Sequence, residues 1–189
     1  MNPAFDARPI IVAIAGPNGA GKSTFYEALL GSAGLRYVNA ADIARELGID
    51  AYEAAAVAER VRGALVASNE SFVFETVFSD PNGAKVDFLR EAAERGYTVI
   101  LCFIGLDATS TSDERVAMRV MQGGHDVPLD KLEARYPRSL DNLRRAIAEL
   151  PRVLVYDNSD LSAPFRQVAE FEEGRLVGDW PPLPSWLPI

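Results

Sequence analysis

Short apolar runs alternate with longer amphipathic segments along most of the chain. The run Ile10–Ala15 is continuous and rich in β-branched residues, which predicts a strand buried on both faces of a sheet. Four further runs predict strands, at Leu35–Asn39, Ser71–Glu75, Tyr97–Gly105 and Arg152–Tyr156. Strands that alternate with helices form parallel sheets covered on both faces, so the pattern predicts an α/β fold with a doubly wound, mostly parallel, five-stranded sheet.

The segments between these runs predict helices. Ser23–Leu30 ends near two glycines, and Pro81–Arg95 is stopped by Gly96. Pro137 predicts a break or kink near Tyr136 in the last helix, because proline lacks the N–H that an interior helical position donates. The remaining helices are expected at Ala51–Ala67, Thr111–Met121 and Asp130–Leu150.

The C-terminal part of the chain has a different pattern. Phe165–Phe171 and Arg175–Val177 predict a small hairpin, and Asp179–Ile189 is rich in proline and holds two tryptophans. We expect this hairpin and tail, residues 163–189, to end in an extended packing strap on the surface; a peptide ligand for another domain is the alternative. No internal repeat or low-complexity linker interrupts the sequence, so residues 1–189 are interpreted as one domain.

Composition narrows the functional class. The net charge is −8, with 27 acidic against 19 basic residues, which disfavours a nucleic-acid-binding face or a polybasic membrane contact. No apolar stretch reaches the roughly 20 residues that span a bilayer, and the first residues lack the pattern of a signal peptide. We therefore expect a cytoplasmic protein. Its only cysteine, Cys102, lies within a strand run and is expected to be a buried, unreactive thiol.

The most specific chemical signal follows the first strand. Residues 16–24 read GPNGAGKST and fit the phosphate-binding pattern G-x-x-x-x-G-K-[ST] between a predicted strand and a predicted helix. Glycines allow backbone N–H groups to surround a polyphosphate, Lys22 can reach the β- and γ-phosphates, and Ser23 offers a hydroxyl to Mg²⁺. The residues expected to bind ATP are Gly16, Pro17, Asn18, Gly19, Ala20, Gly21, Lys22, Ser23 and Thr24.

Other nucleotide-binding classes fit the sequence less well. An ABC transporter ATPase requires an LSGGQ-like segment before an apolar run that ends in Asp-Glu. Gln122–His125 matches that segment only weakly, and no such run follows it. A switch GTPase requires an N/T-K-x-D base-reading motif, which the sequence lacks. A small kinase remains, and a kinase needs further groups to activate its acceptor.

Three acidic residues stand at the ends of predicted strands, where doubly wound sheets bind their ligands. Glu75 closes an apolar strand, which is typical of a carboxylate that holds Mg²⁺; a solvated strand end is the alternative. Asp42 follows the second strand and is either a helix N-cap or a group that takes the proton of an acceptor hydroxyl. Asp157 ends the fifth strand, and with Asn158 and Ser159 it predicts a turn.

Basic residues collect in one part of this acidic chain. Asp113–Arg152 holds eight basic against seven acidic residues, and seven of the basic ones are arginines. Arg115 and Arg119 share one face of a predicted helix. Arginines that close over a transferring phosphoryl group neutralise its charge, so we expect an arginine-bearing helical lid at residues 109–138; a solvated helix with glutamate partners is the alternative. His125, the only histidine, either stabilises its loop or takes part in chemistry.

These pieces together resemble the zeta-toxin family of P-loop kinases, in its short single-domain branch. The resemblance is carried by Gly16–Thr24, by Asn39–Ala44 (NAADIA), by Phe74–Thr76, and by Arg115–Pro128 continuing through Arg135–Leu143. Better-known members of that family phosphorylate the 3′-hydroxyl of UDP-N-acetylglucosamine with ATP and Mg²⁺. The resemblance therefore implies a P-loop kinase fold and the same class of reaction.

The resemblance also implies a role for each matching residue. Asp42 would be the general base, Glu75 and Thr76 would lie near the metal or the substrate, and the arginines around Arg119 would form the lid. Which role belongs to Arg115 and which to Arg119 stays open. The residues expected to contact the substrate are Asp42, Glu75, Thr76, His125 and Arg135, and those expected to bind the metal are Ser23 and Glu75.

The sequence thus predicts an ATP- and Mg²⁺-dependent small-molecule kinase with Asp42, Lys22, Arg119 and Arg115 as catalytic residues. The expected acceptor is a nucleotide sugar such as UDP-N-acetylglucosamine, or another sugar or nucleoside. A small antitoxin-like protein is the partner that the resemblance implies. The competing hypothesis is a nucleotide-binding regulatory or toxin-like interaction protein without small-molecule turnover.

Overall fold

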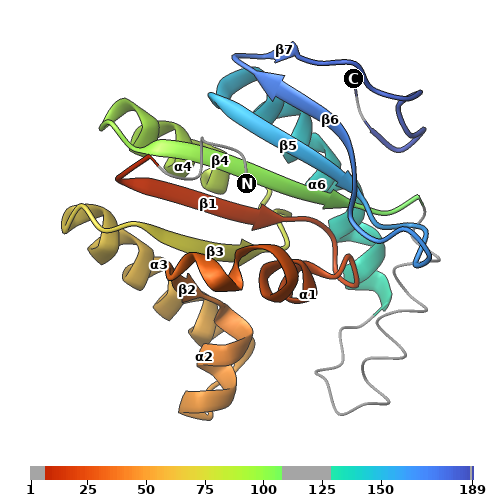
Figure 1. The fold of residues 1–189 in the computed structure, drawn as a ribbon. Helices are drawn as coiled ribbons and strands as arrows, with labels where there is room; N and C mark the ends of the chain where they lie inside the picture. The colour runs from red at the N-terminus through yellow and green to blue at the C-terminus, as the bar shows by residue number, and fades with distance from the viewer. Residues whose placement is uncertain (1–6, 108–128, 188) are drawn as a thin grey trace.

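The computed structural model describes residues 7–107, 129–187 and 189, with side chains from residue 134 onward in the second range. Seven strands form one sheet in the order β2-β3-β1-β4-β5-β6-β7 (Figure 1). The first five strands in this order are parallel to one another, whereas β6 is antiparallel to β5 and β7 to β6. The strands are β1 Ile10–Ala15, β2 Arg36–Val38, β3 Phe72–Thr76, β4 Thr98–Gly105, β5 Arg152–Asp157, β6 Arg166–Glu172 and β7 Arg175–Leu176.

The sheet is larger than predicted because the C-terminal hairpin joins it. β6 pairs with β5 along its whole length, from Arg152 opposite Glu172 to Asp157 opposite Arg166. Without β6, the apolar strand β5 would lie at the edge of the sheet with unpaired backbone groups. The predicted hairpin and the mostly parallel α/β fold are therefore confirmed, but the expectation of five strands is wrong.

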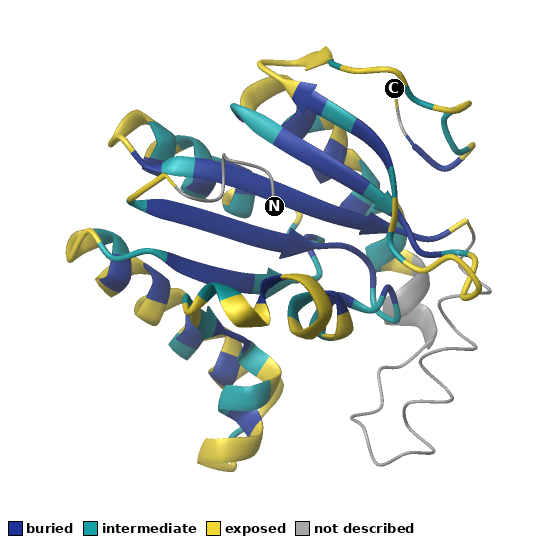
Figure 2. Cartoon of the chain, in the orientation of Figure 1, coloured by how far each residue is buried: buried dark blue, intermediate teal, exposed yellow. Residues whose placement is uncertain are grey.

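The centre of the sheet is buried from both sides. All six residues of β1 have no exposed surface, which confirms the prediction from its continuous apolar run. Cys102 of β4 is also buried, as expected, and burial raises the pKa of its thiol to about 12. Figure 2 shows the pattern as dark blue strands beside helices with exposed outer sides.

Helices cover both faces of the sheet. One face packs against three helices, α3 (Ala51–Ala67), α4 (Ala84–Glu94) and α6 (Leu129–Glu149). The other face is covered by α1 (Lys22–Phe25) and its continuation η2 (Tyr26–Leu30). α2 (Ala40–Leu47) packs against α3 next to the short edge strand β2 (Figure 1). Within the described residues, no helix has both the length and the apolar character to cross a membrane.

Two helices differ from their predicted form. The helix predicted at Ser23–Leu30 is α-helical only as far as Phe25, and it continues as the π-helical η2 and the 3₁₀-helical η3 (Gly31–Ala33). The expected break at Pro137 does not occur: α6 runs without interruption through this residue. Tertiary contacts hold this turn: the hydroxyl of Tyr136 donates to the carbonyl of Leu106 at 2.6 Å, at the end of β4.

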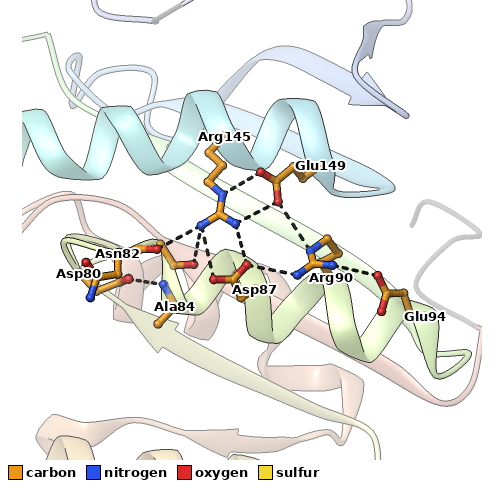
Figure 3. A network of polar contacts seen from close by, with 9 residues as sticks. Asp80, Asn82, Ala84, Asp87, Arg90, Glu94, Arg145 and Glu149 are labelled. Carbon is orange, nitrogen blue, oxygen red and sulfur yellow. Dashed lines mark hydrogen bonds and ion pairs between the residues drawn. The ribbon is translucent and has the colours of Figure 1, made fainter.

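Charged side chains join α4 to α6 (Figure 3). Arg145 of α6 donates to Asp87 of α4 at 2.6 Å and to Glu149 at 2.7 Å, and the bond to Asp87 holds the pKa of that carboxyl below its usual value. Arg145 also donates to the backbone carbonyl of Asn82 in the loop before α4. Arg90 extends the network to both carboxylates. α6 is thereby fixed to α4 and to the loop that follows β3.

The C-terminal tail packs on the sheet rather than away from it. Trp186 and Leu187 are buried within the same core as α3, α4 and α6. The Trp186 ring lies 6.2 Å from the Phe103 ring between centroids, and it covers Gly105, where any side chain would overlap it. The tail therefore contacts the core through Trp186 and Leu187.

Candidate nucleotide and metal site

The phosphate loop connects β1 to α1 and adopts backbone conformations that require glycine. Gly16, Gly19 and Gly21 have φ angles of 147°, 77° and 87°, in the region that side chains rarely enter. A side chain at Gly16 would also overlap the backbone carbonyl of Ile104 in β4. The loop thus lies against the carboxyl ends of β1 and β4, as its sequence pattern predicts.

The ammonium group of Lys22 lies against the phosphate loop itself. Its Nζ donates to the carbonyls of Gly16 at 3.1 Å and Pro17 at 3.0 Å, and the residue is 7% exposed. A buried ammonium is stable only where its donors are satisfied. The loop carbonyls therefore hold this charge beside the backbone N–H groups that would surround a polyphosphate.

A carboxylate from the neighbouring strand meets the loop at Ser23. The Ser23 hydroxyl donates to Oε2 of Glu75 at 2.8 Å, and the same oxygen accepts from the Tyr37 hydroxyl at 2.6 Å and from the Asn39 amide at 3.3 Å. Because the Ser23 hydroxyl donates a hydrogen bond to the carboxylate, the lone pairs of its oxygen stay available to a cation. Mg²⁺ prefers hard oxygen ligands and usually binds to one or two protein groups plus phosphates and water, so this pair fits that ion.

No cluster of three or more His, Cys, Asp or Glu side chains that could hold a metal occurs within the part of the chain that the structure describes. An ion that relied on protein ligands alone would need such a cluster, whereas Mg²⁺ bound with a nucleotide does not. The hydrogen-bonded oxygens of Ser23 and Glu75 are the described groups that could hold Mg²⁺ beside a nucleotide.

Tyr37 and Asn39 both donate to Glu75, although no motif pointed to Tyr37 and Asn39 entered only as the first residue of the matching segment Asn39–Ala44. The Tyr37 ring stacks on Tyr26 with 3.7 Å between centroids and 4° between planes. Burial and the adjacent Glu75 carboxylate raise the pKa of Tyr37 far above its usual value, so its hydroxyl stays protonated and remains a donor. Asn39 also donates to the Tyr37 oxygen at 3.1 Å. A tyrosine within a short strand run looks like an ordinary core residue.

Asp42 lies in the first turn of α2 but does not cap this helix. Asn39 is the N-cap, since its Oδ1 accepts the N–H of Ala41 at 2.8 Å. Asp42 instead forms an ion pair of 2.7 Å with Arg45 on the same helix, and the Arg45 side chain is 71% exposed. The capping alternative for Asp42 is therefore wrong. Its ion pair is exposed to solvent and therefore holds the carboxylate only weakly.

The other predicted substrate residues are only partly covered by the structure. Thr76 ends β3, and its Oγ1 accepts the N–H of Phe78 at 3.1 Å, which leaves its own proton available to another acceptor. Arg135 lies on α6 and is half-buried. Arg115, Arg119 and His125, with most of the predicted lid, lie outside the described residues. Among the predicted site residues within the described ranges, Ser23 of the phosphate loop is joined directly to Glu75, which comes from a distant part of the chain.

The segment after β5 forms the predicted turn and also supports the phosphate loop. The Ser159 hydroxyl and N–H both donate to Oδ1 of Asp157, at 2.6 and 3.1 Å. Asn158 is buried, and its amide donates to the carbonyl of Ala20 at 2.9 Å. The sequence pointed to the turn but not to this contact, because an Asn in a turn usually bonds to its own backbone.

One family model matches this chain. It is the zeta toxin model, which matches residues 50–167, more than half of the chain, beginning after the phosphate loop. No curated protein matches the chain in sequence.

Solved structures share the fold at low sequence identity. The AvrRxo1-ORF1:-ORF2 structure with ATP has a TM-score of 0.70 and 18% identity over 92% of this chain, which spans 62% of that one. A structure of the PezAT chromosomal toxin-antitoxin system of Streptococcus pneumoniae has a TM-score of 0.57 and 15% identity, covering 90% of this chain and 82% of the other. A gluconokinase from Sinorhizobium meliloti 1021 has a TM-score of 0.52 and 21% identity, covering 83% and 85%.

These similarities agree with the fold and the loop geometry described above. A parallel sheet, a glycine-dependent phosphate loop after the central strand and a serine–carboxylate pair at its edge are the framework of nucleotide-binding kinases. The chain belongs to the zeta toxin family and has the fold of the P-loop kinases.

Proposed function

We propose that this chain is an ATP- and Mg²⁺-dependent kinase that transfers the γ-phosphoryl group to a hydroxyl of a small molecule. The observation that carries the proposal is the hydrogen bond between Ser23 of the phosphate loop and Glu75 at the end of β3. This contact joins a phosphate-binding element to a carboxylate in the arrangement that a metal-bound triphosphate requires. The family membership supports the same reaction class.

Each residue has a defined part in the proposed reaction. The phosphate loop and Lys22 bind the β- and γ-phosphates, and Ser23 and Glu75 hold the metal. Mg²⁺ supplies positive charge that neutralises these phosphates. The oxygen of the acceptor hydroxyl forms a bond to the γ-phosphorus while Asp42 accepts the proton of that hydroxyl. The bond between the γ-phosphorus and the β-γ bridging oxygen breaks, and ADP is released.

The arginines of the expected lid, residues 109–138, are the part of the proposal that concerns the transferring phosphoryl group. Arg115 and Arg119 are proposed to neutralise the charge that this group carries in the transition state, a contribution of about 10³ to 10⁵ in rate where it has been measured for other enzymes. Arg135 and His125 are proposed to contact the acceptor. These assignments rest on the sequence pattern of the segment.

UDP-N-acetylglucosamine is the first acceptor to test, because it is the acceptor of better-known members of the family. The chain is incubated with ATP, Mg²⁺ and the nucleotide sugar, and ³¹P NMR follows a new phosphomonoester signal together with ADP. Mixtures of sugars and nucleosides are tested in the same way. Nucleotide binding without transfer to any acceptor would refute the kinase and favour a nucleotide-dependent interaction protein.

The role of Asp42 has a matched control on the same helix. Asp42→Asn is expected to retain ATP binding and to lower the transfer rate by at least about 100-fold, since general base catalysis contributes roughly 10²–10⁴. Glu46→Gln, an exposed neutralisation of charge in α2, is expected to leave the rate unchanged. Transfer by Asp42→Asn at the rate of Glu46→Gln would remove Asp42 from the role of base.

A protein partner is also part of the proposal. AvrRxo1-ORF1 is seen with AvrRxo1-ORF2, and PezAT is a toxin-antitoxin system. By analogy we propose a small antitoxin-like protein that binds this chain. The product of an adjacent gene is the candidate, and co-elution of the two purified proteins on size-exclusion chromatography is the test; separate elution at micromolar concentrations would contradict the proposal.

A further inference from the structure

Three donors converge on a single oxygen of Glu75, and the shortest bond comes from Tyr37. The Tyr37 hydroxyl lies 2.6 Å from Oε2, compared with 2.8 Å for Ser23 and 3.3 Å for Asn39. Within the described residues Oε1, the second oxygen of Glu75, accepts no hydrogen bond. The carboxylate is thus fixed through one oxygen and presents the other.

The position of the Tyr37 hydroxyl is itself fixed by two contacts. Asn39, the N-cap of α2, donates to the hydroxyl oxygen at 3.1 Å, so the hydroxyl proton is directed to Glu75. The ring lies flat on Tyr26, the first residue of η2, which continues the helix that carries Lys22 and Ser23. Tyr37 is therefore attached to the same helix as the hydroxyl that shares its acceptor oxygen.

The Ser23 bond alone leaves the carboxylate free to turn. A single hydrogen bond fixes one point of a glutamate side chain with three rotatable bonds, whereas a second donor from another element limits its rotation. Groups that orient a metal ligand through hydrogen bonds typically change metal affinity by about 10- to 100-fold when they are removed. The phenol has the length, the fixed ring and the donor for this task.

We propose that Tyr37 is a positioning residue that holds the Glu75 carboxylate in the orientation in which Glu75 and Ser23 bind Mg²⁺ with the phosphates of ATP. This inference rests on the proposed function for the identity of the metal–nucleotide complex, but it concerns binding and not transfer. Tyr37 acts through Glu75 and touches neither the nucleotide nor the acceptor.

The test compares the same substitution on the two stacked rings. Isothermal titration calorimetry measures ATP binding at a series of Mg²⁺ concentrations for wild type, Tyr37→Phe and Tyr26→Phe. Both variants keep the ring stack, but only Tyr37→Phe removes a donor to Glu75, since the Tyr26 hydroxyl has no hydrogen bond within the described residues. Tyr37→Phe is expected to raise the Mg²⁺ concentration for half-maximal effect by about 10- to 100-fold, and Tyr26→Phe by less than about twofold.

Two further measurements separate orientation from loss of structure. ATP binding without Mg²⁺ is expected to be unchanged in both variants, because the phosphate loop is intact. In a double-mutant cycle, Tyr37→Phe is expected to add nothing to Glu75→Gln, since both changes act on the same carboxylate.

Several results would overturn the inference. These are a wild-type Mg²⁺ dependence in Tyr37→Phe, equal loss of ATP affinity with and without Mg²⁺, or full additivity with Glu75→Gln. Failure of the proposed function is a different result, because it leaves these binding curves intact and shows only as absence of phosphoryl transfer by the wild type.

Discussion

Replacing Asn142 with leucine would remove two hydrogen bonds that tie α6 to the loop after β3. Asn142 is 7% exposed, and its amide nitrogen donates to the carbonyls of Phe78 at 2.8 Å and Asp80 at 2.9 Å. Phe78 is itself buried and has a φ of 62°, which is unfavourable for a large side chain. The two bonds therefore hold a strained turn directly after Glu75 and Thr76.

The loss of stability follows from the fate of the two carbonyls. A buried carbonyl left without a donor costs about 1–3 kcal/mol. The Phe78 carbonyl lies in the core, whereas Asp80 is only half-buried and its carbonyl regains water. The expected loss is about 1–3 kcal/mol in the free energy of unfolding, or a fall in melting temperature of roughly 2–12 °C for a chain of this size.

Urea unfolding followed by tryptophan fluorescence measures this loss. Asp141→Asn is the matched control on the same helix, because it removes an exposed ion pair with Arg144 whose contribution is expected to stay below about 0.5 kcal/mol. An Asn142→Leu variant within about 0.5 kcal/mol of Asp141→Asn would refute the argument that these bonds hold the turn.

Two further predictions concern buried groups in β4 and the tail. Burial raises the pKa of the Cys102 thiol to about 12, so above the ordinary thiol pKa of about 9 only the unfolded chain loses the proton and the folded state becomes less stable. Between pH 7 and 10 the free energy of unfolding of the wild type should therefore drop by about 1.4 kcal/mol more than that of Cys102→Ala. Parallel pH profiles of the two proteins would contradict this prediction. Gly105→Ala should expel the Trp186 ring that covers Gly105 and lower the free energy of unfolding by up to about 3–5 kcal/mol. In a Trp180→Phe background, where Trp186 is the only tryptophan, its fluorescence emission should shift to the red. An unchanged emission maximum would show that the ring is not packed there.

The central strand and its loop were predictable because local signals determine them. Ile10–Ala15 is too uniformly apolar for any position but the middle of a sheet, and Gly16–Thr24 has few alternatives between a strand and a helix. Whether the hairpin joins the sheet depends on contacts between residues far apart in the sequence. The alternating residues of Arg166–Glu172 suit a free surface hairpin and an added strand equally well, so the sequence pattern left the seven-stranded sheet unforeseen.

The candidate site divides in the same way. Ser23 and Glu75 carry chemistry that their local patterns indicate, and the structure places them in contact. The roles of Tyr37 and Asn39 depend on which side chains meet between separate elements. The choice between Asn39 and Asp42 as the N-cap depends on where α2 begins, and helix boundaries shift by one or two residues without a visible change in pattern.

The shortness of both outer strands has a consequence for how this protein behaves at high concentration. The described sheet is bounded by β2 and β7, of three and two residues. Arg36 places an exposed charge on β2, paired with Glu70 at 2.9 Å. Each outer strand itself thus offers a foreign chain a template of only two or three residues. A short, charged outer strand disfavours intermolecular strand addition, which is the usual route from a large open sheet to fibrous aggregates.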